Sequence, residues 1–432
     1  MEIQTKPPAS IVGKYRWTIC ALLFLATTIN YIDRQILSLI KPILDEELNW
    51  SNEQFGLVNS AFQGAYAVGL LFFGWFVDRF GAKVGYAVSI IAWSFAAMGH
   101  SFVSSVNGFL VARAALGVGE GGNFPSAIKA TATWFPQRER AFATTLFNAG
   151  TNVGPILAPA IVPWIAYAYG WQTTFIVAGV AGLFWLLLWI PFYSEPAKNK
   201  HVTAEELSFI ESDKADIIIG PKSSWFGLLK YRQTWSFVVA KFMTDPVWWF
   251  FLIWLPDYFK KTRGLDIKES WVHLVLIYTI ITALSIVGGW LTGHLTKQGW
   301  SVTRARKTGF FLFALCFLPI FLVTRIGDWP AVFLIGLAGA AHQAWSANLF
   351  TTVSDMFPKY AVGSVIGIGG MAGAVGGMLF PVFAGRLLDI FTAQGNVTGG
   401  YTVLFTICAF AYIVAFVIHH LLAPKFEKFT MK

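Results

Sequence analysis

Asn30-Tyr31-Ile32-Asp33-Arg34 lies within an otherwise apolar run that extends from Trp17 to Ile40. Since about 20 apolar residues suffice for a helix to cross a bilayer, this run predicts a membrane-spanning helix. An acid and a base at such depth are costly, and they usually face a protein interior or a water-filled cavity. We therefore expect Asp33 and Arg34 to point away from lipid.

Asp33 and Arg34 cannot both contact the same atom, because adjacent helix positions diverge by about 100°. One hypothesis is that Arg34 binds an anionic substrate while Asp33 carries a proton. The alternative is an ion pair that holds helices together. The residues around this pair are consistent with both hypotheses.

The composition indicates an integral membrane protein. Of 432 residues, 56% are hydrophobic and only 13% are charged, whereas soluble domains contain about 25% charged residues. The net charge of +9 does not indicate nucleic-acid binding, because the Lys and Arg residues fall in short loops between apolar runs. That is where the positive-inside rule places them.

The cysteines and the first residues exclude other classes. Cys20, Cys316 and Cys408 lie in apolar runs without paired spacing, so neither a disulfide nor a metal site is expected. Residues 1–16 are polar and lack a short apolar core ahead of a cleavage site, so we expect the first span to be retained.

Twelve apolar runs predict an all-α fold of twelve transmembrane helices with both termini in the cytoplasm. The runs are roughly 17–40, 54–77, 84–104, 107–132, 140–166, 170–193, 233–258, 269–293, 308–326, 329–356, 361–390 and 398–423. The basic loops fall on one side if both ends of the chain are cytoplasmic. One loop disagrees, because it places basic residues on the outside: Lys260, Lys261, Arg263 and Lys268.

A polar interval divides the chain into two sets of six runs. We expect an N-terminal half at 1–193, a cytoplasmic linker at 194–233 and a C-terminal half at 234–432. Within the linker, Thr203-Ala-Glu-Glu206 has the spacing of a capping box and predicts a short amphipathic helix on the cytoplasmic surface.

The two halves resemble copies of each other. Two motifs recur 222 positions apart, Phe135-Pro136 at Phe357-Pro358 and Gly154 with Pro159 at Gly376 with Pro381. Parallel repeats of six spans are typical of transporters, in which the substrate site lies near the midplane between the halves. The repeat favours transport over membrane-bound enzyme chemistry.

The fourth run adds Arg113 and Glu120, seven residues apart and therefore on one helix face. Both can face the same cavity as Asp33 and Arg34. Burial and a neighbouring guanidinium act in opposite directions on the proton affinity of a carboxyl. Closing the cavity or binding an anion could therefore load and release a proton, as a symporter requires. A static network between the two helices is the alternative.

Glu120 lies in Gly117-Val-Gly-Glu120-Gly-Gly122, which matches a nucleotide-binding pattern. No strand precedes these glycines, so we interpret them as small residues for close helix packing.

The second half offers further polar candidates. The repeat offset places His342 opposite Glu120, within the polar stretch from Ala341 to Asn348. This stretch suits a polyhydroxylated ligand, although a hydrogen-bonded core histidine is equally consistent. In the seventh run, Lys241 and Asp245 are spaced to pair with each other, or Lys241 can share the charge of the substrate.

The loop Gly74-Trp-Phe-Val-Asp78-Arg79-Phe-Gly81-Ala-Lys83 resembles the loop 2–3 signature of the major facilitator superfamily. The resemblance extends from Trp17 to about Pro424. Acid and bases in this turn can lock two helix ends in one state of an alternating-access cycle. The expected conformational lock consists of Gly74, Asp78, Arg79, Gly81 and Lys83.

Other motifs are similar to the anion:cation symporter branch of that superfamily, and more narrowly to bacterial hexuronate transporters. The branch motifs are Tyr31-Ile-Asp33-Arg34, Arg113 with Glu120, Asn123-Phe-Pro125 and Trp134-Phe-Pro136-Gln-Arg-Glu-Arg140. The hexuronate motifs are Phe147-Asn148-Ala-Gly150-Thr-Asn-Val-Gly154, Asp245-Pro246-Val-Trp248 and Ala341-His342-Gln343-Ala344.

The resemblance implies proton-coupled uptake of glucuronate or galacturonate across the bacterial inner membrane by a monomer. Its partners would be the sugar-acid anion, protons and membrane lipid, with no cofactor, metal or nucleic acid. The implied proton-coupling residues are Asp33, Glu120 and Arg113. The implied substrate contacts are Tyr31, Arg34, Tyr66, Asn148, Asn152, Lys241, His342, Gln343, Trp345 and Asn348.

Two positions depart from the family pattern. Gly293-His294 stands in the second half where the first half has Asp78-Arg79, and Lys241 stands where hexuronate carriers lead us to expect arginine. A carrier of an aldonate or aldarate, such as galactonate or glucarate, is therefore an open alternative. A membrane-bound glycosyl- or acyltransferase fits the layout less well.

Overall fold

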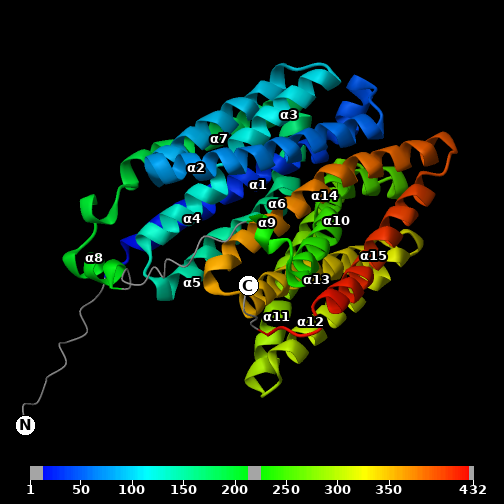
Figure 1. Ribbon diagram of the computed structural model, residues 1–432. Coiled ribbons are helices and arrows are strands. Elements are labelled where there is room, and N and C mark those ends of the chain that lie inside the picture. Colours follow the sequence, from blue (N-terminus) through cyan, green and yellow to red (C-terminus); the bar gives the residue numbers. More distant parts are fainter. Residues whose placement is uncertain (1–12, 213–224, 428–432) are drawn as a thin grey trace, which may run out of the picture.

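The computed structural model describes residues 13–212 and 225–427, which form a bundle of helices (Figure 1). The first half contains α1 (Tyr15–Leu48), α2 (Asn52–Gly99), η1 (His100–Phe102), α3 (Val106–Glu120), α4 (Asn123–Trp134), α5 (Gln137–Asn148), α6 (Gly150–Tyr169) and α7 (Trp171–Phe192). The connection contains η2 (Pro196–Lys198), α8 (Ala204–Glu211) and α9 (Trp225–Leu228). The second half contains α10 (Arg232–Arg263), α11 (Ile267–Lys297), α12 (Val302–Phe317), η3 (Leu318–Arg325), α13 (Asp328–Met356), α14 (Lys359–Ala393) and α15 (Val397–Leu422).

These elements account for the twelve predicted spans. Helix α2 contains two spans, separated at Gly81, whose φ of 81° breaks the helix. Three other spans each consist of two segments, namely α3 with α4, α5 with α6, and α12 with η3. In the described part of the chain, eight helical segments are long and apolar enough to cross a membrane by length and composition. Helices α1, α3, α4 and α13 are not among the eight, and three of these carry most of the predicted polar site.

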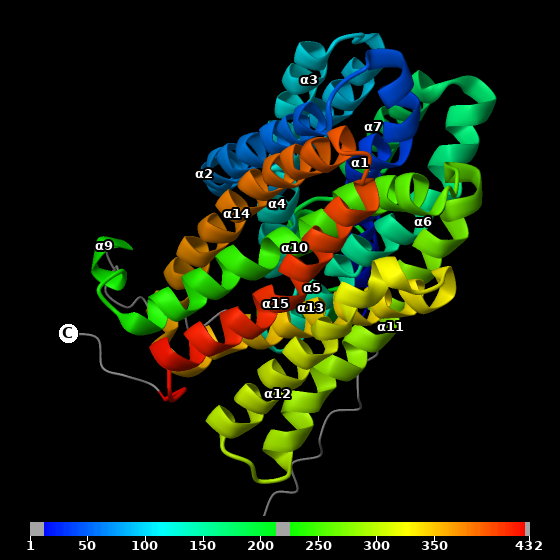
Figure 2. The ribbon, with the colours of Figure 1, turned by 90° about the vertical axis from the view of Figure 1, so that its right-hand side faces the viewer.

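The two halves pack as separate bundles that meet along a few helices (Figures 1 and 2). Within the halves, α2 packs on α3 and α7, α10 packs on α14 and α15, and α11 packs on α13. Between the halves, α2 packs on α14, α6 on α11, and α1 on α10. The all-helical prediction is confirmed, while the residue boundaries predicted for the halves and the linker stay predictions.

The connection between the halves defines one end of the bundle, here called the linker end. Tyr15 at the start of α1 donates a hydrogen bond to the carbonyl of Phe192 at the end of α7. Arg232 at the start of α10 donates to the carbonyl of Leu421 in α15. The first and last turns of each half therefore lie at this end.

Helix α8 is tied to the first half through Glu206. The Thr203 hydroxyl accepts a hydrogen bond from the Glu206 amide, as the predicted capping box requires. The Glu206 carboxylate accepts from the backbone amides of Tyr15 and Arg16, at 3.2 and 3.1 Å, instead of folding back on its own helix. The Arg16 guanidinium also binds this carboxylate, which explains its orientation.

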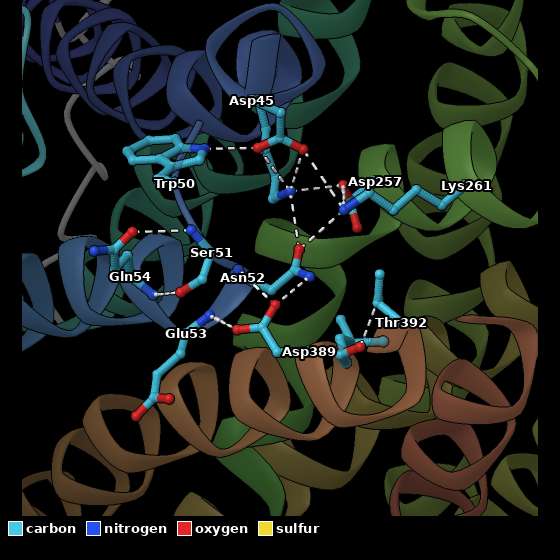
Figure 3. A network of polar contacts seen from close by, with 12 residues as sticks. Asp45, Trp50, Ser51, Asn52, Glu53, Gln54, Asp257, Lys261, Asp389 and Thr392 are labelled. Carbon is cyan, nitrogen blue, oxygen red and sulfur yellow. Dashed lines mark hydrogen bonds and ion pairs between the residues drawn. The ribbon is translucent and has the colours of Figure 1, made fainter. Parts of the chain in front are cut away.

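At the opposite end a polar network joins the halves, here called the inter-half latch (Figure 3). It consists of Lys41, Asp45, Asn52, Asp257, Lys261 and Asp389. Lys41 Nζ of α1 lies 2.8 Å from Asp257 Oδ1 of α10, and both residues are buried. Asp389 of α14 accepts hydrogen bonds from the amide and side chain of Asn52 at the start of α2.

Carboxylates balance three of the four basic residues in the loop that disagreed with the charge rule. Lys261 binds Asn52 and lies 3.3 Å from Asp257. Lys260 pairs with Asp266, and Arg263 lies 3.4 Å from Asp328. These positive charges are balanced by carboxylates at the same end of the bundle, so they do not add net positive charge there.

Glycines bring α3 close to α2 and so fix the position of Glu120. A Cβ at Gly121 would lie 2.5 Å from the carbonyl carbon of Gly69 and 2.6 Å from the amide nitrogen of Leu70. The structure therefore supports close helix packing as the role of this glycine-rich stretch. It also shows that the predicted fourth span is two helices, because α3 ends at Glu120 and α4 begins at Asn123.

We predict that Gly121→Ala lowers the free energy of unfolding by about 1–3 kcal/mol, since the added methyl group must displace the α2 backbone. The φ of −57° at Gly121 is ordinary for a helix, so the expected cost is steric. Thermal unfolding of the purified protein in detergent measures the effect. Gly99→Ala is the matched control, because no atom lies within 4 Å of its added Cβ. Equal stability of the two variants would contradict the packing argument.

We predict that Asp257→Asn lets the halves separate at the latch, because it removes a charge partner from buried Lys41. Removing one member of a buried pair costs about 3–5 kcal/mol, and opening that end would let water solvate Lys41. Spin labels at Ser104 and Gln394, on a background without the native cysteines, report the distance between the halves by electron–electron resonance. We expect longer distances in Asp257→Asn.

The control for this prediction is Lys260→Met, which removes an exposed ion pair at the same end. Exposed pairs contribute about 0–1 kcal/mol, so its distances should match those of the wild type. An unchanged distance distribution in Asp257→Asn would show that the latch does not hold the end closed.

Candidate functional site

The charged residues of α1 and α3 meet in the interior of the first half. Arg34 Nε donates to Glu120 Oε2 at 2.7 Å, with both side chains buried. The two oxygens of Asp33 are buried and have no hydrogen-bond partner. The ion pair thus joins α1 to α3 through Arg34 and leaves Asp33 without a direct bond.

Aromatic rings surround the Arg34 guanidinium. Its Cζ lies 4.7 Å from the ring centre of Tyr31 and 4.6 Å from that of Tyr66. Phe62 lies at 5.3 Å, and Trp249 of α10 lies at 5.8 Å. Such rings attract a cation and hold its plane in place. Because Trp249 belongs to the second half, Arg34 lies where the halves meet.

Several buried polar atoms around this pair lack hydrogen-bond partners, which is uncommon in protein interiors. They are both side-chain atoms of Asn30, both oxygens of Asp33, Nε and Nη2 of Arg113, and Oε1 of Glu120. Together with Arg34, three ionisable side chains and one amide that retain bonding capacity thus form one cluster. This cluster, hereafter the charged cluster, can accept a proton or an anion.

The sequence analysis singled out the four charged members of this cluster but omitted Asn30, Phe62 and Trp249 as site residues. Asn30 is the first residue of the polar segment that contains Asp33 and Arg34. Trp249 follows directly after the Asp245-Pro246-Val-Trp248 motif. A position in or next to a motif was the sequence signal for Asn30 and Trp249, whereas Phe62 had none. Their contacts depend on helices that are distant in the chain.

In the second half, His342 is held by its neighbours. Its Nδ1 lies 2.6 Å from the Tyr412 hydroxyl, and its ring stacks on Trp248 with centroids 5.4 Å apart. Lys241 Nζ lies 2.6 Å from Asp245 Oδ2, so these residues pair with each other, which is one of the two alternatives predicted for Lys241. The structure thus gives His342 the hydrogen bond expected of a core histidine.

Two further predicted contacts have protein neighbours in this conformation. Trp345 has no exposed surface and packs on Phe310 and Tyr412. Asn348 donates a hydrogen bond to the carbonyl of Arg306 and lies 3.3 Å from its guanidinium. A role of Trp345 or Asn348 in substrate binding stays a prediction.

The remaining predicted residues are scattered. Asn148 is exposed, whereas Asn152 and Gln343 are half-buried. In the predicted lock, Asp78 pairs with Lys129 of α4 at 3.1 Å, an exposed contact within the first half. Its role as a conformational lock stays a prediction.

Comparison with known proteins identifies the family. Residues 23–381 match the model of the Major Facilitator Superfamily. The hexuronate transporter of Escherichia coli (strain K12) is 31% identical over 416 residues, covering 95% of this chain and 94% of that protein. The galacturonate transporter of Dickeya chrysanthemi is 32% identical over 279 residues, covering 64% of this chain and 81% of that protein.

A relative with another substrate name and a solved structure complete the comparison. The probable galactarate/D-glucarate transporter of Bacillus subtilis (strain 168) is 29% identical, covering 91% of this chain and 89% of that protein. A bacterial homologue of the human lysosomal transporter Spinster, in an inward-facing and occupied conformation, has a TM-score of 0.76 at 16% identity. The alignment covers 95% of this chain and 98% of that one, and at this identity it shows the fold alone.

These findings confirm the predicted class of protein. The homologues and the fold are those of transporters rather than enzymes, and the apolar helices make the chain a multi-pass membrane protein. The chain belongs to the Major Facilitator Superfamily.

Proposed function

We propose that the protein is a proton-coupled symporter that imports a hexuronate, glucuronate or galacturonate, by alternating access across the bacterial inner membrane. The observation that carries the proposal is the Arg34–Glu120 ion pair beside unpartnered Asp33. The hexuronate and galacturonate transporters among the relatives support the substrate class. Carriers of galactonate, galactarate or glucarate are the alternative, which the relative from Bacillus subtilis keeps open.

The orientation in the membrane follows from charge. Basic residues gather at the linker end, in the loops between spans and near the last residues of the chain: Arg79, Lys83, Arg138, Arg140, Arg304, Lys307 and Lys425. The positive-inside rule therefore assigns the linker end, with both termini, to the cytoplasm. The inter-half latch then lies on the outer side, and we propose that the protein is a monomer that faces inward in this conformation.

Arg34 is suited to bind the carboxylate of the substrate. Its Nε is bonded to Glu120, while the terminal nitrogens of a guanidinium carry four further N–H donors. Two parallel hydrogen bonds from a guanidinium to a carboxylate are strong and fix the orientation of the ligand. Tyr31, Tyr66 and Trp249 hold the guanidinium from both halves of the protein.

The balance of charge explains why a proton must accompany the substrate. The charged cluster holds two acids, Asp33 and Glu120, and two bases, Arg34 and Arg113. A bound carboxylate adds a third negative charge at a buried place, where unbalanced charges are costly. One proton restores neutrality, so we infer one proton for each monocarboxylate.

Asp33 is the proposed carrier of this proton, with Glu120 as the second acid and Arg113 as the base that adjusts both. Asp33 receives no hydrogen bond that would stabilise its charge. A carboxylate bound to the terminal nitrogens of Arg34 offsets the charge of the guanidinium and so weakens its hold on Glu120. Substrate and proton thus compete with the same ion pair, which couples their binding.

The test of the function is uptake of radiolabelled glucuronate into proteoliposomes driven by a proton gradient. Unlabelled galacturonate should compete, whereas glucose, which lacks a carboxylate, should not. Competition mainly by galactonate or glucarate would keep the mechanism and change the substrate. Uptake that does not depend on the gradient would contradict the proton-coupled mechanism.

We predict that Asp33→Asn abolishes gradient-driven accumulation but preserves exchange of labelled for unlabelled substrate, because the amide cannot carry the proton. Uptake and counterflow in the same proteoliposomes separate the two activities. Asp328→Asn, a half-exposed carboxyl paired with Arg263, should behave as the wild type. Loss of binding in folded Asp33→Asn would instead assign Asp33 to the substrate.

We predict that Arg34→Ala weakens substrate binding by at least about 100-fold, since it removes two charge-assisted hydrogen bonds of about 1.5–3 kcal/mol each. Arg34→Lys should restore only part of the affinity, because an ammonium cannot bind a carboxylate through two parallel bonds. Isothermal titration of the purified protein measures the change, with exposed Arg325→Ala as control. Unchanged affinity in Arg34→Ala would refute the carboxylate site.

A further inference from the structure

A polar stripe on α10 extends from the charged cluster toward the linker end. Lys241, Asp245 and Trp249 are four residues apart and therefore lie on one helix face. Trp249 contacts Arg34 across the boundary between the halves. Lys241 lies about 12 Å from Trp249 along the helix axis, toward the start of α10. The stripe thus begins at the proposed carboxylate site and continues along the second half.

Helix α14 supports this stripe with small residues. A Cβ at Gly373 would collide with the Asp245 carboxylate, and a Cβ at Gly377 would lie 2.7 Å from the Trp249 ring. Gly373 and Gly377 are also four residues apart, so they lie on one face of α14 and leave room for Asp245 and Trp249. Asp245 and Trp249 are therefore held in place by the same pair of helices.

Lys241 has its charge balanced within the stripe. Its Nζ lies 2.6 Å from Asp245 Oδ2 and 4.7 Å from the ring centre of Phe350 on α13. The Lys241 side chain is 8% exposed, whereas that of Asp245 is 20% exposed. A ligand beside the stripe would therefore meet the acid more readily than the base.

Another base of the second half is also paired. Arg306 of α12 lies 3.1 Å from Asp355 and contacts Asn348 and Thr292. His342 is bonded to Tyr412 and stacked on Trp248. This side of the site thus offers hydrogen bonds and rings to a ligand, with the charge of Lys241 compensated.

We propose that Asp245 masks the charge of Lys241 and so makes the transporter select sugar acids with one carboxylate over those with two. This inference rests on the proposed function. A uronate places its single carboxylate on Arg34, and its other end carries only carbonyl or hydroxyl groups. An aldarate carries a carboxylate at each end, and the second one meets the Lys241–Asp245 pair, which has no net positive charge.

The proposal separates the candidate substrates into those with one carboxylate and those with two. Glucuronate, galacturonate and galactonate carry one carboxylate and remain substrates. Glucarate and galactarate carry two and are rejected, because burying the second charge beside Asp245 is unfavourable. Asp245 is then a residue that determines specificity without itself binding the preferred substrate.

The experiment compares the affinities of the purified protein for glucuronate and glucarate by isothermal titration. The wild type should bind glucuronate at least about tenfold more tightly, by the cost of an unbalanced buried charge. Asp245→Asn frees Lys241 for the second carboxylate and should raise the glucarate-to-glucuronate affinity ratio about tenfold. The double variant Lys241→Met with Asp245→Asn removes both charges and should return the ratio to its wild-type value.

Lys241→Met provides a second, independent measurement. It leaves the Asp245 carboxylate without a partner, so it should weaken glucarate binding more than glucuronate binding. Size-exclusion chromatography verifies that each variant is folded, and if Asp245→Asn fails to fold, the Lys241→Met ratio decides.

The outcomes separate the inference from the proposed function. Equal wild-type affinities for glucuronate and glucarate would overturn the masking role and leave the uptake of sugar acids standing. An unchanged ratio in folded Asp245→Asn and in Lys241→Met would overturn it as well. A wild type that binds no sugar acid at all would overturn the proposed function and, with it, the inference.

Discussion

The Arg34–Glu120 ion pair is the interaction on which the rest of the site depends. It joins α1 to α3 inside the first half, where an isolated charge would be costly. Glycines of α3 let that helix approach α2, and this close packing places Glu120 within reach of Arg34. The rings of Tyr31, Tyr66 and Trp249 contact the guanidinium from both halves. A change in the Arg34–Glu120 pair therefore alters a contact between the halves.

The same requirement for balanced charge recurs at two other places. At the latch, buried Lys41 binds Asp257 and Asp45, and these pairs join the halves. On α10, Lys241 binds Asp245 within one helix. A pair between halves resists their separation, whereas a pair within one helix moves as a unit. The first kind therefore bears on conformation and the second on what the site accepts.

These pairs differ from the charged cluster in how completely they are satisfied. Asp33, Arg113 and Asn30 keep buried polar atoms without partners. Protein interiors rarely tolerate such atoms, because each one loses its bonds to water without replacement. A place that tolerates several of them together is suited to a ligand or proton that binds and leaves.

The sequence by itself determined the membrane class and the all-helical fold, and it singled out the charged residues Asp33, Arg34, Arg113 and Glu120. Hydrophobic length, repeat spacing and intramembrane charge are properties of local sequence, so they can be read directly. Tertiary structure decided that Arg34 pairs with Glu120, that Trp249 contacts Arg34, and that Lys41 and Asp257 join the halves at one end. Those contacts join helices up to 216 residues apart, and a sequence pattern cannot fix which faces of distant helices meet.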